Sequence, residues 1–73
     1  MSALSNITAA EVQVGDLIHL TPQVDLRVIG IAQRTAKMIK FRTEYVRCDF
    51  APGRVGQAWP SRHRLDTELS VTR

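Results

Sequence analysis

The stretch IKFRTEY, residues 39–45, alternates apolar and charged side chains more cleanly than any other part of the chain. An extended backbone places alternate side chains on opposite faces. The inward face would then carry Ile39, Phe41, Thr43 and Tyr45. The outward face would carry Lys40, Arg42 and Glu44. This period of two predicts a half-buried β-strand.

Four other segments have strand character, rich in β-branched residues and bounded by turn residues. They are residues 17–20, 26–34, 57–65 and 68–72. A hairpin at residues 34–37 would join the second of them to the strand at 39–45. Gly30 predicts a bulge or bend within its strand. Pro22 and Pro60 cannot donate to a ladder, so each marks a strand end or a sheet edge.

The remaining segments predict turns and loops. Residues 1–6 are expected to form a disordered N-terminus. TAAE, residues 8–11, has the spacing of a capping box and predicts one short helical turn. It is stopped by VGD, residues 14–16. DFAPGRVGQ, residues 49–57, holds a proline and two glycines and predicts a loop. Residues 7–73 would then form a single small β-barrel domain.

Five short strands in a chain of 73 residues predict a small all-β domain. Closure into a barrel is a common way for such a sheet to remove its edges. The segments VQVGDLIHL (12–20), LRVIGIAQRTAKMIKFRTE (26–44) and RLDTELSV (64–71) resemble SH3-like small barrels. They are also similar to short proteins of actinobacteria and their phages that share a VGD opening turn and a closing DTxLxV strand. The resemblance implies a five-stranded SH3-like barrel and a phage or actinobacterial setting.

Composition limits the function classes. A domain of this size buries only about 60% of the surface that its unfolded chain exposes, so dimerisation or docking onto a partner would help to stabilise it. Cys48 is the single cysteine, which excludes an internal disulfide, and no residues stand at metal-ligand spacing. We therefore expect no metal and no cofactor. The lone thiol, with neither a signal peptide nor a long apolar run, favours a cytoplasmic protein, in the host cytoplasm if phage-encoded, and no membrane partner.

Charge is unevenly distributed along the chain. The net charge is +3, yet residues 1–26 carry three acidic residues and no Lys or Arg. Nine of the ten basic residues lie in residues 27–64. A basic middle segment is typical of proteins that bind nucleic acid or an acidic protein surface. The alternative is an ordinary solubilising surface.

The residues predicted to form a basic face are Arg34, Lys37, Lys40, Arg42, Arg54, Arg62 and Arg64. Arginine binds phosphate and carboxylate in a two-point fashion. Trp59 could add a stacking surface for a base. As the only tryptophan of a small chain, however, it is expected in the core rather than on the surface.

The loop at residues 49–57 is the predicted protein-binding element. Phe50 and Val55 give it more apolar content than a solvated connection needs. The alternative is that Phe50 closes one end of the barrel. Residual open edges of such a sheet can also pair with an extended partner segment.

Catalysis has weaker support. His19, His63 and Cys48 are the only imidazoles and thiol, and nothing in their spacing places a base beside a nucleophile. His63, between two arginines, should favour its neutral form. We therefore predict no enzyme, unless an oligomer builds a site across a symmetry axis.

The sequence thus predicts a non-enzymatic binding module. Its first interpretation is a phage-type factor that binds an acidic protein surface and modifies or inhibits a cellular machine. The alternative is a nucleic-acid-binding barrel that contacts phosphates. An exposed Trp59 within the basic face would favour nucleic acid, and an exposed Phe50 would favour protein.

Overall fold

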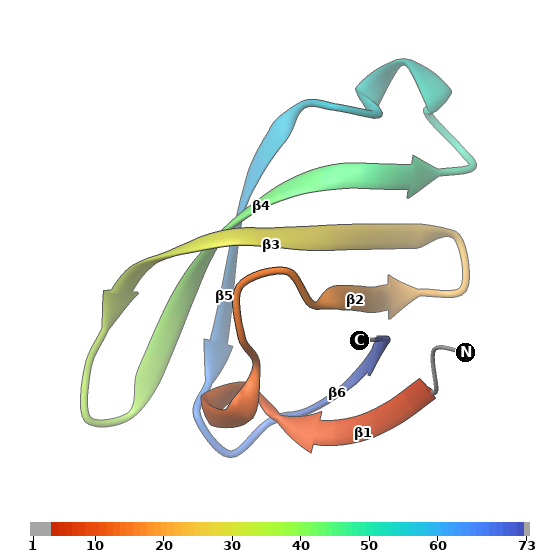
Figure 1. Cartoon of the computed structure of the whole chain (residues 1–73). Coiled ribbons are helices and arrows are strands. Elements are labelled where there is room, and N and C mark those ends of the chain that lie inside the picture. Colours follow the sequence, from red (N-terminus) through yellow and green to blue (C-terminus); the bar gives the residue numbers. More distant parts are fainter. Residues whose placement is uncertain (1–3, 73) are drawn as a thin grey trace.

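The computed structural model describes residues 4–72, which form one antiparallel sheet and two short 3₁₀ turns (Figure 1). The six strands are β1 (Leu4–Thr8), β2 (Leu17–Thr21), β3 (Val24–Arg34), β4 (Met38–Cys48), β5 (Ala58–Arg64) and β6 (Glu68–Thr72). The two 3₁₀ turns are η1 (Ala9–Glu11) and η2 (Pro52–Arg54). The spatial order of the six strands in the sheet is β1-β6-β2-β3-β4-β5. The predicted all-β class is confirmed.

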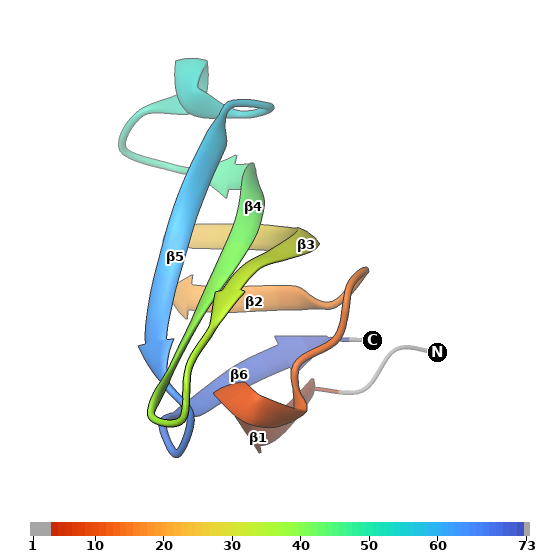
Figure 2. The same ribbon diagram turned by 90° about the vertical axis from the view of Figure 1, so that its left-hand side faces the viewer.

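The central pair β3–β4 carries the bend of the sheet. Its ladder shifts register three times, two of them at Val28/Gly30 and Ile31/Gln33. Each shift adds a residue on one strand, which kinks and twists the pair. The bulge predicted at Gly30 is therefore confirmed. Figures 1 and 2 show both strands curving along their length, so that β5 turns across the other strands instead of continuing a flat sheet.

The concave side of the sheet holds the core. Every second residue of β4 faces it, and the four inward residues predicted from the alternation are all buried. The largest fully buried side chains come from four strands and are Phe41, Ile18, Leu26, Ile39, Val28 and Val71. Cys48 is a buried free thiol at the end of β4. The core therefore depends on the period of two in the sequence.

The predicted N-terminus and barrel closure need correction. Residues 4–6, expected to be disordered, begin β1, which pairs with β6 and makes the sheet six-stranded instead of five-stranded. Residues 1–3 lie outside the described residues. The sheet is not closed, because β1 and β5 are its edges and do not pair with each other over residues 4–72. After β1 the chain enters η1, whose backbone hydrogen bonds to the end of β5 are limited to two. The Ala10 amide donates to Leu65 O and the Ala9 amide to Thr67 O, both in the turn between β5 and β6.

The helical turn before the VGD segment is confirmed, but its capping differs. The Thr8 hydroxyl donates to the Glu11 carboxylate at 2.9 Å and makes no bond to the backbone of η1. Gly15 then turns the chain at φ +97°, a conformation that strains any residue with a Cβ atom. Its amide donates to Val28 O, which fixes the start of β2 against β3. No helix among residues 4–72 is long and apolar enough to span a membrane.

Candidate binding surface

The convex side of the β4–β5 pair carries a group of cations. The ladder places Lys40 opposite Arg62, Arg42 opposite Pro60 and Met38 opposite Arg64. Because the intervening residues face the core, these side chains share the outer face. Arg42, Arg62 and Arg64 are exposed and Lys40 is half-buried. We call Lys40, Arg42, Arg62 and Arg64 the cationic face.

No residue of the cationic face forms an ion pair within the described part of the chain. Ion pairs there join Asp25 to His19 and to Arg47, and Arg47 to Asp49. Lys40 and Arg62 stand directly opposite each other, and like charges in that position destabilise a sheet. Their positive potential is therefore left for counter-ions or for a ligand.

One further predicted cation, Lys37, lies at the hairpin end of this face, in the turn that leads into β4. Arg34 ends β3 opposite Ile39, which faces the core, so Arg34 lies on the other face of the sheet. The Leu65 amide donates to the Lys37 carbonyl at 3.0 Å, and Lys37 and Arg64 line one shallow hollow. Five of the seven predicted basic residues are thus on one part of the surface.

Arg54 also lies apart from the cationic face. It lies in η2, within the loop that joins the other end of β4 to β5. The amide of Tyr45 bonds to Gln57 O and that of Gly56 to Tyr45 O, so the base of the loop is fixed there. From Lys40 to Tyr45 the strand rises about 16 Å, and the loop extends beyond that point. Arg54 therefore does not belong to the cationic face.

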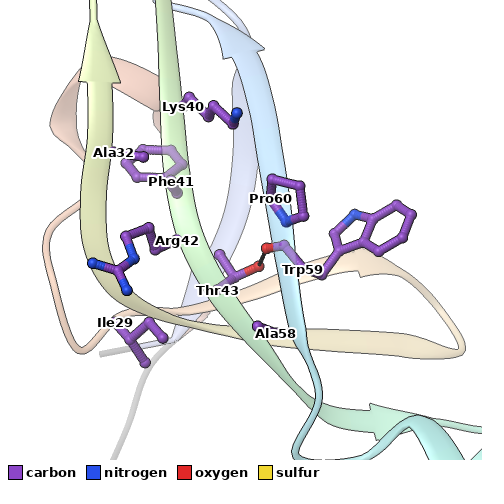
Figure 3. Close-up of a pocket in the computed structure, with 9 residues that line it drawn as sticks. All are labelled: Ile29, Ala32, Lys40, Phe41, Arg42, Thr43, Ala58, Trp59 and Pro60. Carbon is purple, nitrogen blue, oxygen red and sulfur yellow. Dashed lines mark hydrogen bonds between the residues drawn. The ribbon is translucent and has the colours of Figure 1, made fainter.

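A hollow of about 300 Å³ opens beside the cations (Figure 3). Its walls come from three strands and are lined by Ile29, Ala32, Lys40, Phe41, Arg42, Thr43, Ala58, Trp59 and Pro60. Most of these side chains are apolar, and Ile29 is 45% exposed. The hollow therefore joins apolar surface to positive charge, as a site for an apolar side chain with a nearby carboxylate requires.

Trp59 is not in the core, contrary to the prediction. It is 44% exposed, with its ring centroid 5.9 Å from that of Tyr45. Its ladder partner is Thr43, whose hydroxyl donates to the Trp59 carbonyl. Because β5 is the edge of the sheet, no further strand covers the outer side of the indole among residues 4–72.

The loop at residues 49–57 projects its apolar side chains. Phe50 is 66% exposed and Val55 is 51% exposed, so Phe50 does not close the end of the sheet. Gly56 has φ +89° and lets the chain turn back into β5. Trp59 and Phe50 are therefore both exposed, and their exposure does not separate a nucleic-acid partner from a protein partner. The loop leaves the end of β4 that is opposite the β3–β4 hairpin, where Lys37 and Arg64 lie.

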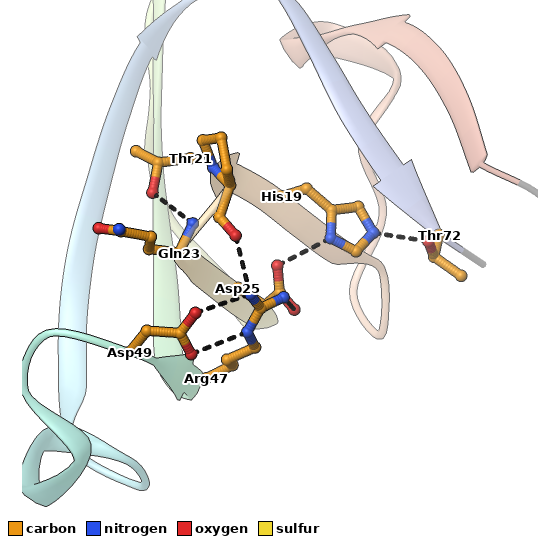
Figure 4. A network of polar contacts seen from close by, with 8 residues as sticks. His19, Thr21, Gln23, Asp25, Arg47, Asp49 and Thr72 are labelled. Atoms are coloured by element: carbon orange, nitrogen blue, oxygen red, sulfur yellow. Dashed lines mark hydrogen bonds and ion pairs between the residues drawn. The ribbon is translucent and has the colours of Figure 1, made fainter.

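A second polar cluster crosses the sheet (Figure 4). His19 contacts Asp25 through Nδ1 at 2.8 Å and Thr72 through Nε2 at 2.7 Å. Arg47 pairs with Asp49 at 2.8 Å and lies 3.8 Å from Asp25. The hydrogen bond between Arg47 and Asp49 raises the pKa of the arginine and lowers the pKa of the carboxyl.

Sequence reasoning missed this cluster. Asp25 and Asp49 belong to separate strands and turns, yet both contact Arg47. The signal that could have found it is Pro22: a β-hairpin centred on this residue places His19 opposite Asp25, as the observed ladder does. The cluster ties β2, β3, β4 and β6 together. No group of three or more metal-ligating side chains occurs in the described ranges.

The other titratable candidates are separated. His63 lies opposite Ile39, with Nε2 bonded to the Ser61 hydroxyl and its ring centroid 6.1 Å from that of Phe41. Cys48 lies at the far end of β4. Burial lowers the pKa of His63, so the neutral form predicted from its arginine neighbours is favoured for a different reason.

No family model, curated protein or solved structure matches the chain.

Proposed function

We propose that the protein is a binding module whose cationic face holds an acidic segment of another protein. The observation that carries the proposal is the Lys40–Arg62 pair, two cations directly opposite on neighbouring strands, neither of which forms an ion pair within residues 4–72. Such a pair costs stability in the free protein. An acidic ligand would remove that cost and gain charge-assisted hydrogen bonds.

The apolar hollow favours a protein ligand. A partner segment could place an apolar side chain among Ile29, Ala32 and Pro60 while its carboxylates meet Lys40 and Arg62. Interfaces commonly combine an apolar anchor with surrounding charge. In this proposal the hollow replaces the loop at 49–57 as the source of the anchor.

Nucleic acid is the second candidate, supported by the exposure of Trp59. An indole that is 44% exposed at the edge of the sheet could stack on a base. It stands opposite Thr43, however, on the face away from Lys40 and Arg42. Its packing against Tyr45 leaves less of the ring free, and we rank this candidate second for that reason.

We also propose the kind of protein and the compartment in which it acts. The resemblance of the VGD turn and the closing strand supports a variant of the SH3-like small barrels and a phage-type factor acting on a cellular machine. The buried free thiol of Cys48 suits a reducing compartment, and we propose the cytoplasm.

We propose no enzymatic role. A hydroxyl, an imidazole and a carboxylate do stand in line at Thr72, His19 and Asp25, an order that nucleophilic sites also use. Asp25 is shared with Arg47, and the chain of contacts joins neighbouring strands. We therefore assign the cluster a structural role.

Fluorescence anisotropy tests the proposal. The ligands are a labelled peptide that carries both Glu and Val, single- and double-stranded DNA, and RNA, at low and physiological salt. We expect the peptide to bind, and Arg62→Gln to weaken it roughly two- to fivefold, as for an exposed ion pair. Arg54→Gln is the matched control and should leave binding unchanged. Absence of peptide binding at low salt, or tighter binding of an oligonucleotide, would contradict the proposal.

A further inference from the structure

We propose that the free edge of β5 takes up the acidic segment as an added antiparallel strand. This inference rests on the proposed function and specifies how the partner binds. Strand addition supplies affinity through main-chain hydrogen bonds and specificity through alternate side chains. It therefore needs unpaired backbone groups, an accessible edge and complementary side chains.

The ladder defines which backbone groups are free. The Tyr45 amide bonds to Gln57 O, and the Leu65 amide bonds to Lys37 O, at the two ends of an unshifted β4–β5 register. Hydrogen-bonded pairs alternate along an antiparallel ladder. Trp59, Ser61 and His63 therefore bond to β4. The even-numbered residues of β5 direct their N–H and C=O groups to the open edge.

Pro60 fits this assignment. It is one of the even-numbered residues, so its missing N–H falls on the open side and breaks no bond to β4. An added strand would lose one hydrogen bond at Pro60 and could form the others through Ala58, Arg62 and Arg64. The Arg64 carbonyl already accepts from Thr67, which limits the added strand at that end.

The other edge of the sheet suits an acidic ligand less well. β1 (Leu4–Thr8) has five residues and contains no charged side chain. β5 has seven residues, two of them exposed arginines. A partner with carboxylates would therefore be selected at β5, because directly opposed opposite charges stabilise a cross-strand pair.

The register predicts the side-chain pattern of the partner. Residues directly opposite each other share one face of a sheet. On the outer face, two acidic residues would stand opposite Arg64 and Arg62, and two apolar residues opposite Pro60 and Ala58. Read along an antiparallel segment, the pattern is acidic-x-acidic-x-apolar-x-apolar. The apolar pair would extend over the hollow that Pro60 and Ala58 line.

A second copy of this chain is a poor occupant. Two β5 strands paired with each other would bring Arg62 and Arg64 of both copies onto one face, and like charges repel there. A strand added beyond β5 would also cover the exposed side of the Trp59 indole.

Backbone methylation of the peptide tests the inference. The parent peptide has the predicted acidic and apolar pattern. In one form the nitrogen of the residue opposite Arg62 is methylated, and in the control the nitrogen of the next residue is methylated. We expect the first to bind about tenfold more weakly than the parent, from the lost hydrogen bond and the clash of the methyl group. The control should bind like the parent, because its N–H points away from β5.

The outcomes separate the two proposals. If the parent peptide does not bind, the proposed function fails and the edge inference fails with it. If the parent and both methylated forms bind equally, the cationic face binds acid without strand addition, and the edge inference alone is overturned. If the free protein dimerises through β5 and the peptide does not dissociate the dimer, the edge belongs to a second copy and the edge inference is overturned as well.

Discussion

At the scale of single residues, position relative to the sheet edge decides what a side chain does. Phe41 on β4 is fully buried, whereas Trp59 on the neighbouring strand is 44% exposed. Both were expected inside, because large aromatic rings usually bury most of their area. The alternation of residues 39–45 identified Phe41 correctly. No local pattern shows that β5 has no strand beyond it, so the exposure of Trp59 could not be predicted.

The stability of the fold should depend on pH through His63. Burial lowers the pKa of this imidazole in the folded protein, so the unfolded chain binds the proton more readily. The free energy of unfolding is thus fully retained above about pH 6.5 and falls as the pH drops below it. In urea denaturation between about pH 7.5 and 5.5, the free energy of unfolding of the His63→Gln variant should fall less steeply than that of the parent protein. Equal slopes would assign the pH dependence to other groups.

At the scale of elements, the hydrophobic period and the turn residues define the strands. β2, β4, β5 and β6 lie within one to three residues of the predicted bounds, and the loop at 49–57 contains only the short turn η2. β1 was missed, because LSNIT has no alternation and becomes a strand by pairing with β6. The five clustered cations follow from the β3–β4 hairpin and the neighbouring β5. Placing Arg34 on the other face required the register of the ladder, and placing Arg54 apart required the direction of the loop.

The loop at 49–57 should depend on one glycine. Gly56 has φ +89°, while the φ of Gly53 is not in the left-handed region, and both have open space around the site of a Cβ atom. Gly56→Ala should therefore lower the free energy of unfolding by about 1 kcal/mol or more through backbone strain. Gly53→Ala in the same loop is the matched control and should change it little. Chemical denaturation of both variants checks this, and equal effects would contradict it.

The β4–β5 pair should be more stable without its opposed cations. Arg62→Glu replaces the like-charge contact with Lys40 by an opposite-charge contact. We expect the free energy of unfolding to rise by about 0.5–1 kcal/mol at low salt, and less at high salt. Arg64→Glu, opposite the uncharged Met38, should give a smaller gain. A protein destabilised by Arg62→Glu would show that Arg62 has a stabilising partner, contrary to our account.

At the scale of the whole molecule, an open sheet leaves one edge strand beside an unneutralised cationic face. A closed barrel was predicted because closure removes edges, but the register shifts in β3–β4 bend the sheet without joining β1 to β5. The all-β class and most of the core followed from periodicity. Closure depends on how strands far apart in the chain meet, and the sequence carries no local signal for that.

The measurement that tests the central claim most directly is an amide chemical-shift map of the ¹⁵N-labelled protein titrated with the acidic peptide. We predict the largest changes along β5 (Ala58–Arg64) and at the outward residues Lys40 and Arg42 of β4, with little change at residues 49–57 and at the His19 cluster. Changes centred on the loop around Phe50, or spread evenly over all exposed basic residues, would contradict the claim that the edge of β5 and its cationic face form the binding surface.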